Sequence, residues 1–337
     1  MSRRARTLVL TAVVLALTGF TTPAVSMGST ADRGSTVTLC LVLSTPSEVE
    51  MTVPVPEPAV EKVLSATRSY RGPCADYGES AERGNGTMTA YSQAERGEPE
   101  AVGLVLETDV LDGLPHDPPT EGRWCYDKDG DGTVDPMTEC AGGYEDALDL
   151  DADAVEEAGL PFTYVLNNWN PHGHMPPGVY DLPHFDVHFY TNPDEERLAI
   201  RPGPCEALVS CDDYELGKNL PAAKYLTEDH EDLDALEPAM GNHLIDLTGP
   251  EHHGERFTHA FIYGTWDGEV TFHEPMITHE WLQGLADGDQ ESGCEPIKQP
   301  GAWQADGWYP TSYCMRYREN RDELTVSLED FVHRTAS

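Results

Sequence analysis

Short runs of β-branched and aromatic residues alternate with turn-forming residues along most of the chain. Examples are "TVTLCLVL", "FTYVLNNW", "HFDVHFYT" and "FTHAFIYGTWDGEVTFHEPMIT", with Gly, Pro and Asn around them. Runs of this length and composition are typical of β-strands. The Trp266-Asp267-Gly268 segment predicts a hairpin, and "GNGT" and "RGEPE" predict turns between short strands. We therefore predict a mainly β protein, either a sandwich or a barrel-like sheet core with a few short helices.

Helical patterns are few and short. "THEWLQGLA" predicts one short helix, and "YEDALDLDADAVEEAGL" predicts another that ends at Gly159. Residues 32–76 predict an N-terminal strand and a Pro-rich extended connector. We expect a β-rich core domain over residues 77–285, within which the acidic, loop-like residues 117–160 are an insertion. Residues 286–337 predict an irregular C-terminal tail held by cysteines.

The chain begins with the pattern of a secretory signal peptide. A charged start is followed by an apolar stretch from Leu8 to Phe20 and then by small residues. We predict a signal peptide over residues 1–31, with cleavage after Ser26 or Ala31, and an exported protein. No later stretch is apolar enough to span a bilayer.

Cysteine usage agrees with export, because disulfides persist in oxidising compartments. The eight cysteines form an even set. Pairing between sequence neighbours, as Cys40–Cys74, Cys125–Cys140, Cys205–Cys211 and Cys294–Cys314, is plausible, but the sequence alone does not fix the pairing.

Charge restricts the partners of the protein. The chain has 21 basic and 60 acidic residues, a net charge of −39, and the acids are scattered over its whole length. Such a surface repels nucleic acid and anionic membranes. A spread acidic surface with little Lys is typical of proteins from salt-loving organisms, in which high salt screens the self-repulsion. The sequence identifies no small-molecule or protein partner, and it leaves a homo-oligomer open.

The segment "WCYDKDGDGTVDPMTEC" contains the D-x-D-x-D-G spacing of calcium loops, in which Gly132 supplies the sharp turn. An acid arrives one position later than the usual bidentate Glu, and Pro136 argues against a helix-loop-helix hand. The loop resembles those of dockerins and thrombospondin type 3 repeats, and Cys125 and Cys140 bracket it. The predicted Ca²⁺ ligands are Asp127, Asp129, Asp131, Thr133 (by its carbonyl), Asp135 and Glu139.

The segment "NPHGHMPPGVYDLPHFDVHFY" concentrates histidines and aspartates. In a strand, residues two apart share a face about 6.6 Å apart, and residues four apart lie about 13 Å apart. His184, Asp186 and His188 therefore share a face, but His184 and His188 cannot reach one ion from a straight strand. Ligands from other segments would complete a metal shell. The candidates elsewhere are His172, His174, His243 and Glu274.

Two known metal patterns fail on this chain. The cupin pattern needs a second histidine at Asp186, and "HEPMITHE" has its histidines six apart with a Pro between, unlike H-E-x-x-H. A longer series, "GNGT", "GLVLETDVLDGLP", the histidine segment, "MGNHLID" and "FTHAFIYGTWDGEVTFHEPMIT", resembles an uncharacterised family of exported prokaryotic proteins, a domain of unknown function. That family usually has N-P-x-G-H-x-P-x-G-x-Y-D-x-P-H-F-D-x-H-F-Y, then M-G-x-H and F-I-Y-G…E-P-M. This chain departs from the family at Met175 and at the calcium loop.

The resemblance implies a β-rich architecture with a histidine-rich centre, and it brings no established reaction. It points to His174, His184, Asp186, His188, His243 and Glu274. Imidazoles with carboxylates suit Zn²⁺ or another first-row transition metal. If no metal binds, these histidines are hydrogen-bonded residues that organise the end of a sheet.

Two functions are consistent with these patterns. The first, which the sequence favours, is an exported, disulfide-stabilised, calcium-binding β protein with a binding or structural role. The alternative is a metal-dependent enzyme of the hydrolase or lyase type that uses the histidine cluster. An accessible metal position beside a pocket would favour the enzyme, and a closed shell would favour the structural role. The chain has no G-x-S-x-G elbow and no P-loop.

Overall fold

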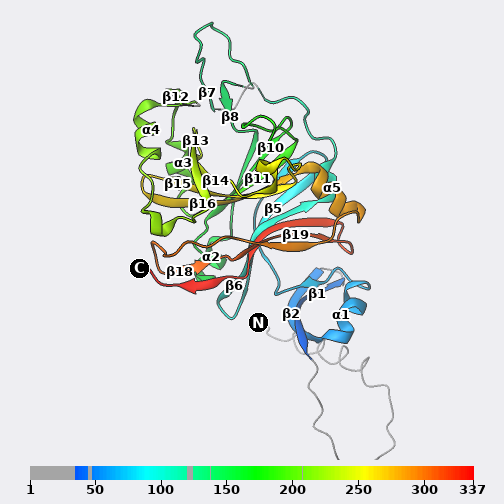
Figure 1. Cartoon of the computed structure of the whole chain (residues 1–337). Coiled ribbons are helices and arrows are strands. Elements are labelled where there is room, and N and C mark those ends of the chain that lie inside the picture. Colours follow the sequence, from blue (N-terminus) through cyan, green and yellow to red (C-terminus); the bar gives the residue numbers. More distant parts are fainter. Residues whose placement is uncertain (1–34, 45–47, 120–123, 137, 207) are drawn as a thin grey trace, which may run out of the picture. The chain divides into compact units, whose positions relative to one another are not determined.

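Two antiparallel sheets form most of the architecture (Figure 1). The computed structural model describes residues 35–337 except 45–47, 120–123, 137 and 207, so the predicted signal peptide lies outside the described residues. Residues Thr36–Ser337 belong to one compact unit. Strands account for 45% and helices for 16% of the structure, which confirms the mainly β prediction.

The first sheet has seven strands. In spatial order they are β13 (His230–Glu237), β14 (Gly241–Asp246), β15 (His259–Trp266), β16 (Glu269–Thr278), β11 (His184–Tyr190), β10 (Tyr164–Asn170) and β9 (Tyr144–Asp149). The second sheet has six strands. They are β17 (Gly293–Pro296), β19 (Ser312–Arg318), β20 (Glu323–Glu329), β6 (Glu98–Glu107), β5 (Gly86–Glu95) and β4 (Asp76–Arg83).

The main hydrophobic core lies between these two sheets, as in a sandwich. Phe185, Val187 and Phe189 of β11 belong to it together with Leu104 of β6 and Val326 of β20. Successive side chains of a strand point to opposite faces. The even-numbered residues of β11, which include the histidines, therefore lie on the face of the seven-stranded sheet that is turned away from this core.

Smaller elements complete the fold. A three-stranded sheet contains β2 (Glu48–Pro56), β1 (Thr36–Ser44) and β3 (Tyr70–Arg71), and two-strand pairs join β18 (Gly307–Tyr309) to β21 (Val332–Arg334) and β7 (Trp124–Cys125) to β8 (Cys140–Ala141). The described α-helices are α1 (Glu57–Leu64), α2 (Ala152–Ala158), α3 (Asp194–Leu198), α4 (Cys211–Gly217) and α5 (His279–Asp287). Short 3₁₀ helices span Thr108–Leu111, Ala223–Tyr225 and Pro250–His253.

Several local predictions are confirmed. The hairpin between β15 and β16 turns at Asp267 and Gly268, whose φ angles of 43° and 88° lie in the left-handed region that such turns need. The helix predicted from "THEWLQGLA" is α5. The structure settles the disulfide pairing that the sequence left open: the four pairs between sequence neighbours are all present, and no cysteine is free. Within the described ranges, no helix has the length and apolarity needed to cross a membrane.

Other segments differ from expectation because pairing with distant strands decides them. The helix expected from "YEDALDLDADAVEEAGL" is confined to α2, since Tyr144–Asp149 pairs with β10 as strand β9. The Pro-rich connector forms β2 and α1. The C-terminal tail supplies β19 and β20, which join the six-stranded sheet through β6. An irregular tail was therefore a wrong expectation for those residues.

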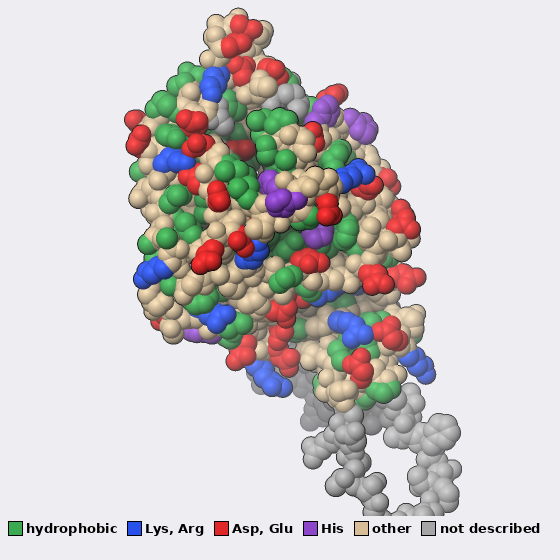
Figure 2. Space-filling model, in the orientation of Figure 1, with side chains coloured by type: hydrophobic (Ala, Val, Ile, Leu, Met, Phe, Trp, Pro, Cys, Tyr) green, Lys and Arg blue, Asp and Glu red, His purple; other side chains and the backbone are tan. Residues whose placement is uncertain are grey.

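Acidic side chains are spread over the surface. Figure 2 shows them in red across the visible face, without one dominant patch and with fewer basic side chains between them. This distribution matches the dispersal of acids along the sequence.

Candidate metal centre

Strand β11 carries the centre of the histidine cluster. His184, Asp186 and His188 lie on its outer face, and they are 0%, 5% and 1% exposed. Asn168 and Met276 are the register partners of Asp186 on the neighbouring strands β10 and β16. The three side chains are thus held in the middle of a sheet, where little backbone motion is available.

The first group consists of His174, His184 and Asp186, and we call it triad A. Its ligand atoms lie within 4.8 Å of one another. Nε2 of His184 lies 3.0 Å from Oδ1 of Asp186, and Nε2 of His174 lies 3.4 Å from Oδ2. The amide of Asn170 donates a hydrogen bond of 2.6 Å to the same Oδ2. His174 comes from the loop between β10 and β11, whereas the other two residues of triad A lie on β11.

The second group consists of His188, His243 and Glu274, and we call it triad B. Its ligand atoms also lie within 4.8 Å of one another, and all three residues are buried. Nε2 of His188 lies 3.4 Å from Oε1 of Glu274, and Nε2 of His243 lies 3.7 Å from Oε2. The three residues come from β11, β14 and β16. The structure thus divides the six predicted residues into two groups, whereas the sequence placed them in one cluster.

Backbone carbonyls orient three of the four imidazoles. Nδ1 of His174 donates to the carbonyl of Met175, Nδ1 of His184 to that of Leu182, and Nδ1 of His243 to that of Ala235. A carbonyl can only accept, so Nδ1 of each ring carries a proton and Nε2 is the nitrogen that faces the carboxylate. Metal-binding histidines are commonly held this way by their other ring nitrogen.

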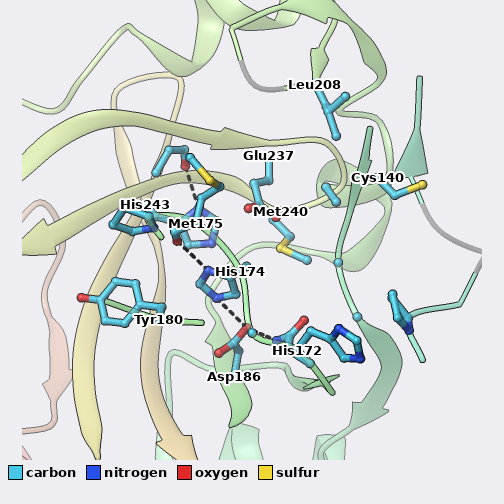
Figure 3. A pocket seen from close by; sticks show the side chains of 18 of the residues that line it. Cys140, His172, His174, Met175, Tyr180, Asp186, Leu208, Glu237, Met240 and His243 are labelled. Carbon is cyan, nitrogen blue, oxygen red and sulfur yellow. Dashed lines mark hydrogen bonds and ion pairs between the residues drawn. The ribbon is translucent and has the colours of Figure 1, made fainter. Parts of the chain in front are cut away.

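Both triads border one cavity of about 470 Å³. Figure 3 shows His174, Asp186 and His243 around this space, with Tyr180, Met240 and Glu237 near them. Glu274 also lines the cavity, whereas His184 and His188 lie behind the lining. Apolar side chains such as Ile245 and Ile262 form much of the remaining wall. The cavity can therefore admit a small molecule to both groups.

Electrostatics differ between the triads. Burial alone would raise the pKa of Asp186, but His184 and His174 outweigh it and hold this pKa well below its usual range. Burial opposes protonation of His174, yet Asp186 raises its pKa to about 9. Triad A without a metal thus pairs the Asp186 carboxylate with the imidazole of His174.

Burial disfavours the charged forms of all three side chains of triad B. Burial lowers the pKa of His188 to about 3 and also lowers the pKa of His243. Burial and the nearby charges of Asp186 and Glu237 raise the pKa of Glu274 well above its usual value. A buried carboxyl of raised pKa beside imidazoles of lowered pKa is a good ligand set for a cation, because a cation favours the carboxylate and the unprotonated ring nitrogens.

Sequence reasoning missed two residues of this site. Asn170 holds Asp186 in place, and its position within the "NPHGH" segment was the available signal. Glu237 lines the cavity and acts electrostatically on His174, His243 and Glu274. It follows an acidic stretch in which no local pattern distinguishes it. The candidate His172 lines the cavity but belongs to neither triad.

The predicted calcium loop lies between β7 and β8 and extends outward at the top of Figure 1. Asp127, Asp129 and Glu139 bring their oxygens within 4.8 Å of one another. Glu139 accepts hydrogen bonds from the backbone N–H groups of Lys128, Asp129 and Asp135, which lower its pKa.

The other predicted calcium ligands do not belong to this group of three. The carboxylate of Asp131 instead accepts hydrogen bonds from the N–H and hydroxyl groups of Thr133. Asp135 takes part through its N–H, which donates to Glu139. The complete calcium ligand set stays a prediction.

These features define a mainly β, disulfide-linked protein with several residue groups that could hold a metal ion. Comparisons with protein-family models, with curated proteins and with solved structures find no match. The resemblance to the uncharacterised exported family therefore stays a prediction.

Proposed function

We propose that this protein is an exported metalloenzyme of the hydrolase or lyase type, which binds a first-row transition metal at the histidine cluster and acts on a small molecule in the cavity. The sequence alone favoured a binding or structural role. The cavity beside both triads supports the enzyme instead, because it leaves the candidate ligands accessible. A divalent ion with three protein ligands keeps a position for water or substrate and acts as a Lewis acid.

One observation carries this proposal. In triad B, Nε2 of His188 and Oε2 of Glu274 are buried and form no hydrogen bond in the described structure. Each unsatisfied buried polar atom costs about 1–3 kcal/mol. Histidines that merely organised a sheet would be expected to satisfy these atoms. A bound cation would satisfy them together, since nitrogen and carboxylate oxygen are ligands that transition metals accept.

We infer in addition that the loop between β7 and β8 binds Ca²⁺ in a structural role. Clustered oxygens of Asp127, Asp129 and Glu139 support this inference. The disulfide Cys125–Cys140 joins the ends of the loop and would preorganise it. Export is supported by the four disulfides, which fit an oxidising compartment.

The first test is elemental analysis of the purified mature protein, dialysed without chelator, for calcium and first-row metals. We expect a transition metal in stoichiometric amount. The variant His188→Ala should hold less transition metal than the wild type while it keeps calcium, and the exposed His253→Ala should resemble the wild type. A transition-metal content near zero in the wild type would refute the metal centre.

Catalysis is tested on the metal-loaded and the chelator-stripped protein. We expect hydrolysis of activated carboxylic or phosphoric esters, or elimination from small hydroxy acids, only in the loaded form. His188→Ala should reduce the rate by about tenfold or more, the scale of damage to a metal shell. A protein that binds metal but turns over none of these compounds would favour the binding role.

A further inference from the structure

The two triads have the same composition and separate locations. Each combines two histidines with one carboxylate, and in each the two imidazoles face different oxygens of that carboxylate. Triad A takes its ligands from β11 and the loop before it. Triad B takes them from β11, β14 and β16. Each group is thus a nearly complete ligand set in itself.

One ion cannot serve both groups. His184 and His188 lie on the same face of β11, and all seven residues of that strand pair in regular register with β10. Residues four apart in such a strand are separated by about 13 Å. Metal–nitrogen distances are about 2.0–2.1 Å, so the two imidazoles cannot converge on one centre. The carboxylates follow the same division, since Asp186 faces His184 and Glu274 faces His188.

Both triads nevertheless border the same cavity. His174 and Asp186 of triad A and His243 and Glu274 of triad B line the same cavity. Glu237 adds a third carboxylate to its wall (Figure 3). Three carboxylates can offset most of the charge of two divalent cations, which a single cation would not require.

We propose that the chain binds two divalent transition-metal ions in this cavity, one at triad A and one at triad B. This proposal rests on the proposed metal centre and adds its stoichiometry and its ligand assignment. The cavity then presents two Lewis acids to one ligand. Such pairs suit substrates with two oxygen donors, such as carboxylate or phosphate groups.

The test is a titration of chelator-stripped protein with Co²⁺, followed by absorption spectroscopy and by metal analysis after gel filtration. We expect two Co²⁺ per chain in the wild type, besides calcium. Asp186→Asn should remove the ion of triad A, and Glu274→Gln should remove that of triad B, so that each variant keeps one. The double variant should keep none, and Glu291→Gln, a matched change at an exposed position outside the cavity, should keep two.

Each outcome decides between the alternatives. One Co²⁺ in the wild type, lost in both single variants, would overturn the two-ion proposal while the metal centre itself would stand. No Co²⁺ in the wild type would refute the metal centre as well. Near-UV circular dichroism checks that the variants fold. If either does not, His174→Gln and His243→Gln replace them and should again keep one ion each.

Discussion

Gly264 illustrates how one residue shapes the surroundings of triad B. A Cβ atom at this position would lie 2.0 Å from Cε1 of Phe272, so only glycine lets that ring lie across β15. The centroid of the Phe272 ring is 5.1 Å from that of His188 and 5.0 Å from that of His243. Phe272 therefore packs against two imidazoles of triad B and restricts their rotation.

His230 is a buried histidine outside both triads, and we expect it to make stability depend on pH. Burial lowers its pKa, and Lys298 acts in the same direction, against Asp246, Asp229 and the carbonyl of Phe261. Its ring also packs against Tyr263. The unfolded chain binds a proton on this residue below about pH 6.5, whereas the folded chain resists doing so. The stability that His230 contributes is complete above that pH and is lost as pH falls toward the folded pKa.

The measurement is urea unfolding of the wild type and of His230→Gln from about pH 7 to about pH 5. We expect the wild type to lose up to about 1.4 kcal/mol per pH unit through this residue, and His230→Gln to show a shallower slope. His253→Gln, at an exposed position, should keep the wild-type slope. Equal slopes in the wild type and His230→Gln would contradict the prediction.

At the scale of elements, the calcium loop and the cavity are neighbours. Lys128, Pro136 and Thr138 of the loop line the cavity, and so do Cys140 and Ala141 of β8. The order of the loop therefore affects one wall of the candidate active site. The disulfide at its base limits how far the loop can move when no ion is bound.

We expect Asp129→Ala to lower the thermal stability in calcium and to abolish the calcium dependence of the melting temperature. The reason is that Asp129 belongs to the three clustered carboxylates, and a ligand that binds only the folded state stabilises it. Melting curves with calcium and with chelator measure the effect. Asp153→Ala removes the same charge at an exposed position of α2. It should change neither the melting temperature in calcium nor its dependence on calcium. An unchanged Asp129→Ala curve would refute the loop assignment.

At the scale of the whole molecule, the main feature is the net charge of −39. Acidic side chains lie across the visible surface in Figure 2, so repulsion is distributed and opposes the compact state. The predicted exclusion of nucleic acid and anionic membranes has the same origin. Screening of this repulsion is the physical basis for the proposed adaptation to high salt.

We expect the melting temperature to rise as sodium chloride is increased from about 0.1 M to about 1 M, over which the screening length falls from about 10 Å to about 3 Å. Differential scanning calorimetry measures this change. A neutral sugar at matched osmolality is the control, because it leaves electrostatic repulsion in place. A melting temperature that does not respond to salt would exclude the adaptation.

Local patterns determined much of this protein. Alternating apolar residues predicted the mainly β fold, and Asp267 and Gly268 predicted the hairpin. The spacing of the cysteines made the four observed disulfides plausible without fixing their pairing. These features depend on residues close together in the chain, where backbone preference and chain length limit the alternatives. For the same reason, the spacing along β11 predicted that His184 and His188 could not share an ion.

The tertiary structure decided what depends on distant partners. The pairing of β20 with β6 placed the C-terminal residues in a sheet, and β16 and β14 brought Glu274 and His243 to His188. The division into two triads, the cavity and the position of Glu237 on the cavity wall all arise from this packing. A sequence specifies the face on which a strand residue points, but the neighbours across that face are set by the register of other strands, which local patterns do not contain.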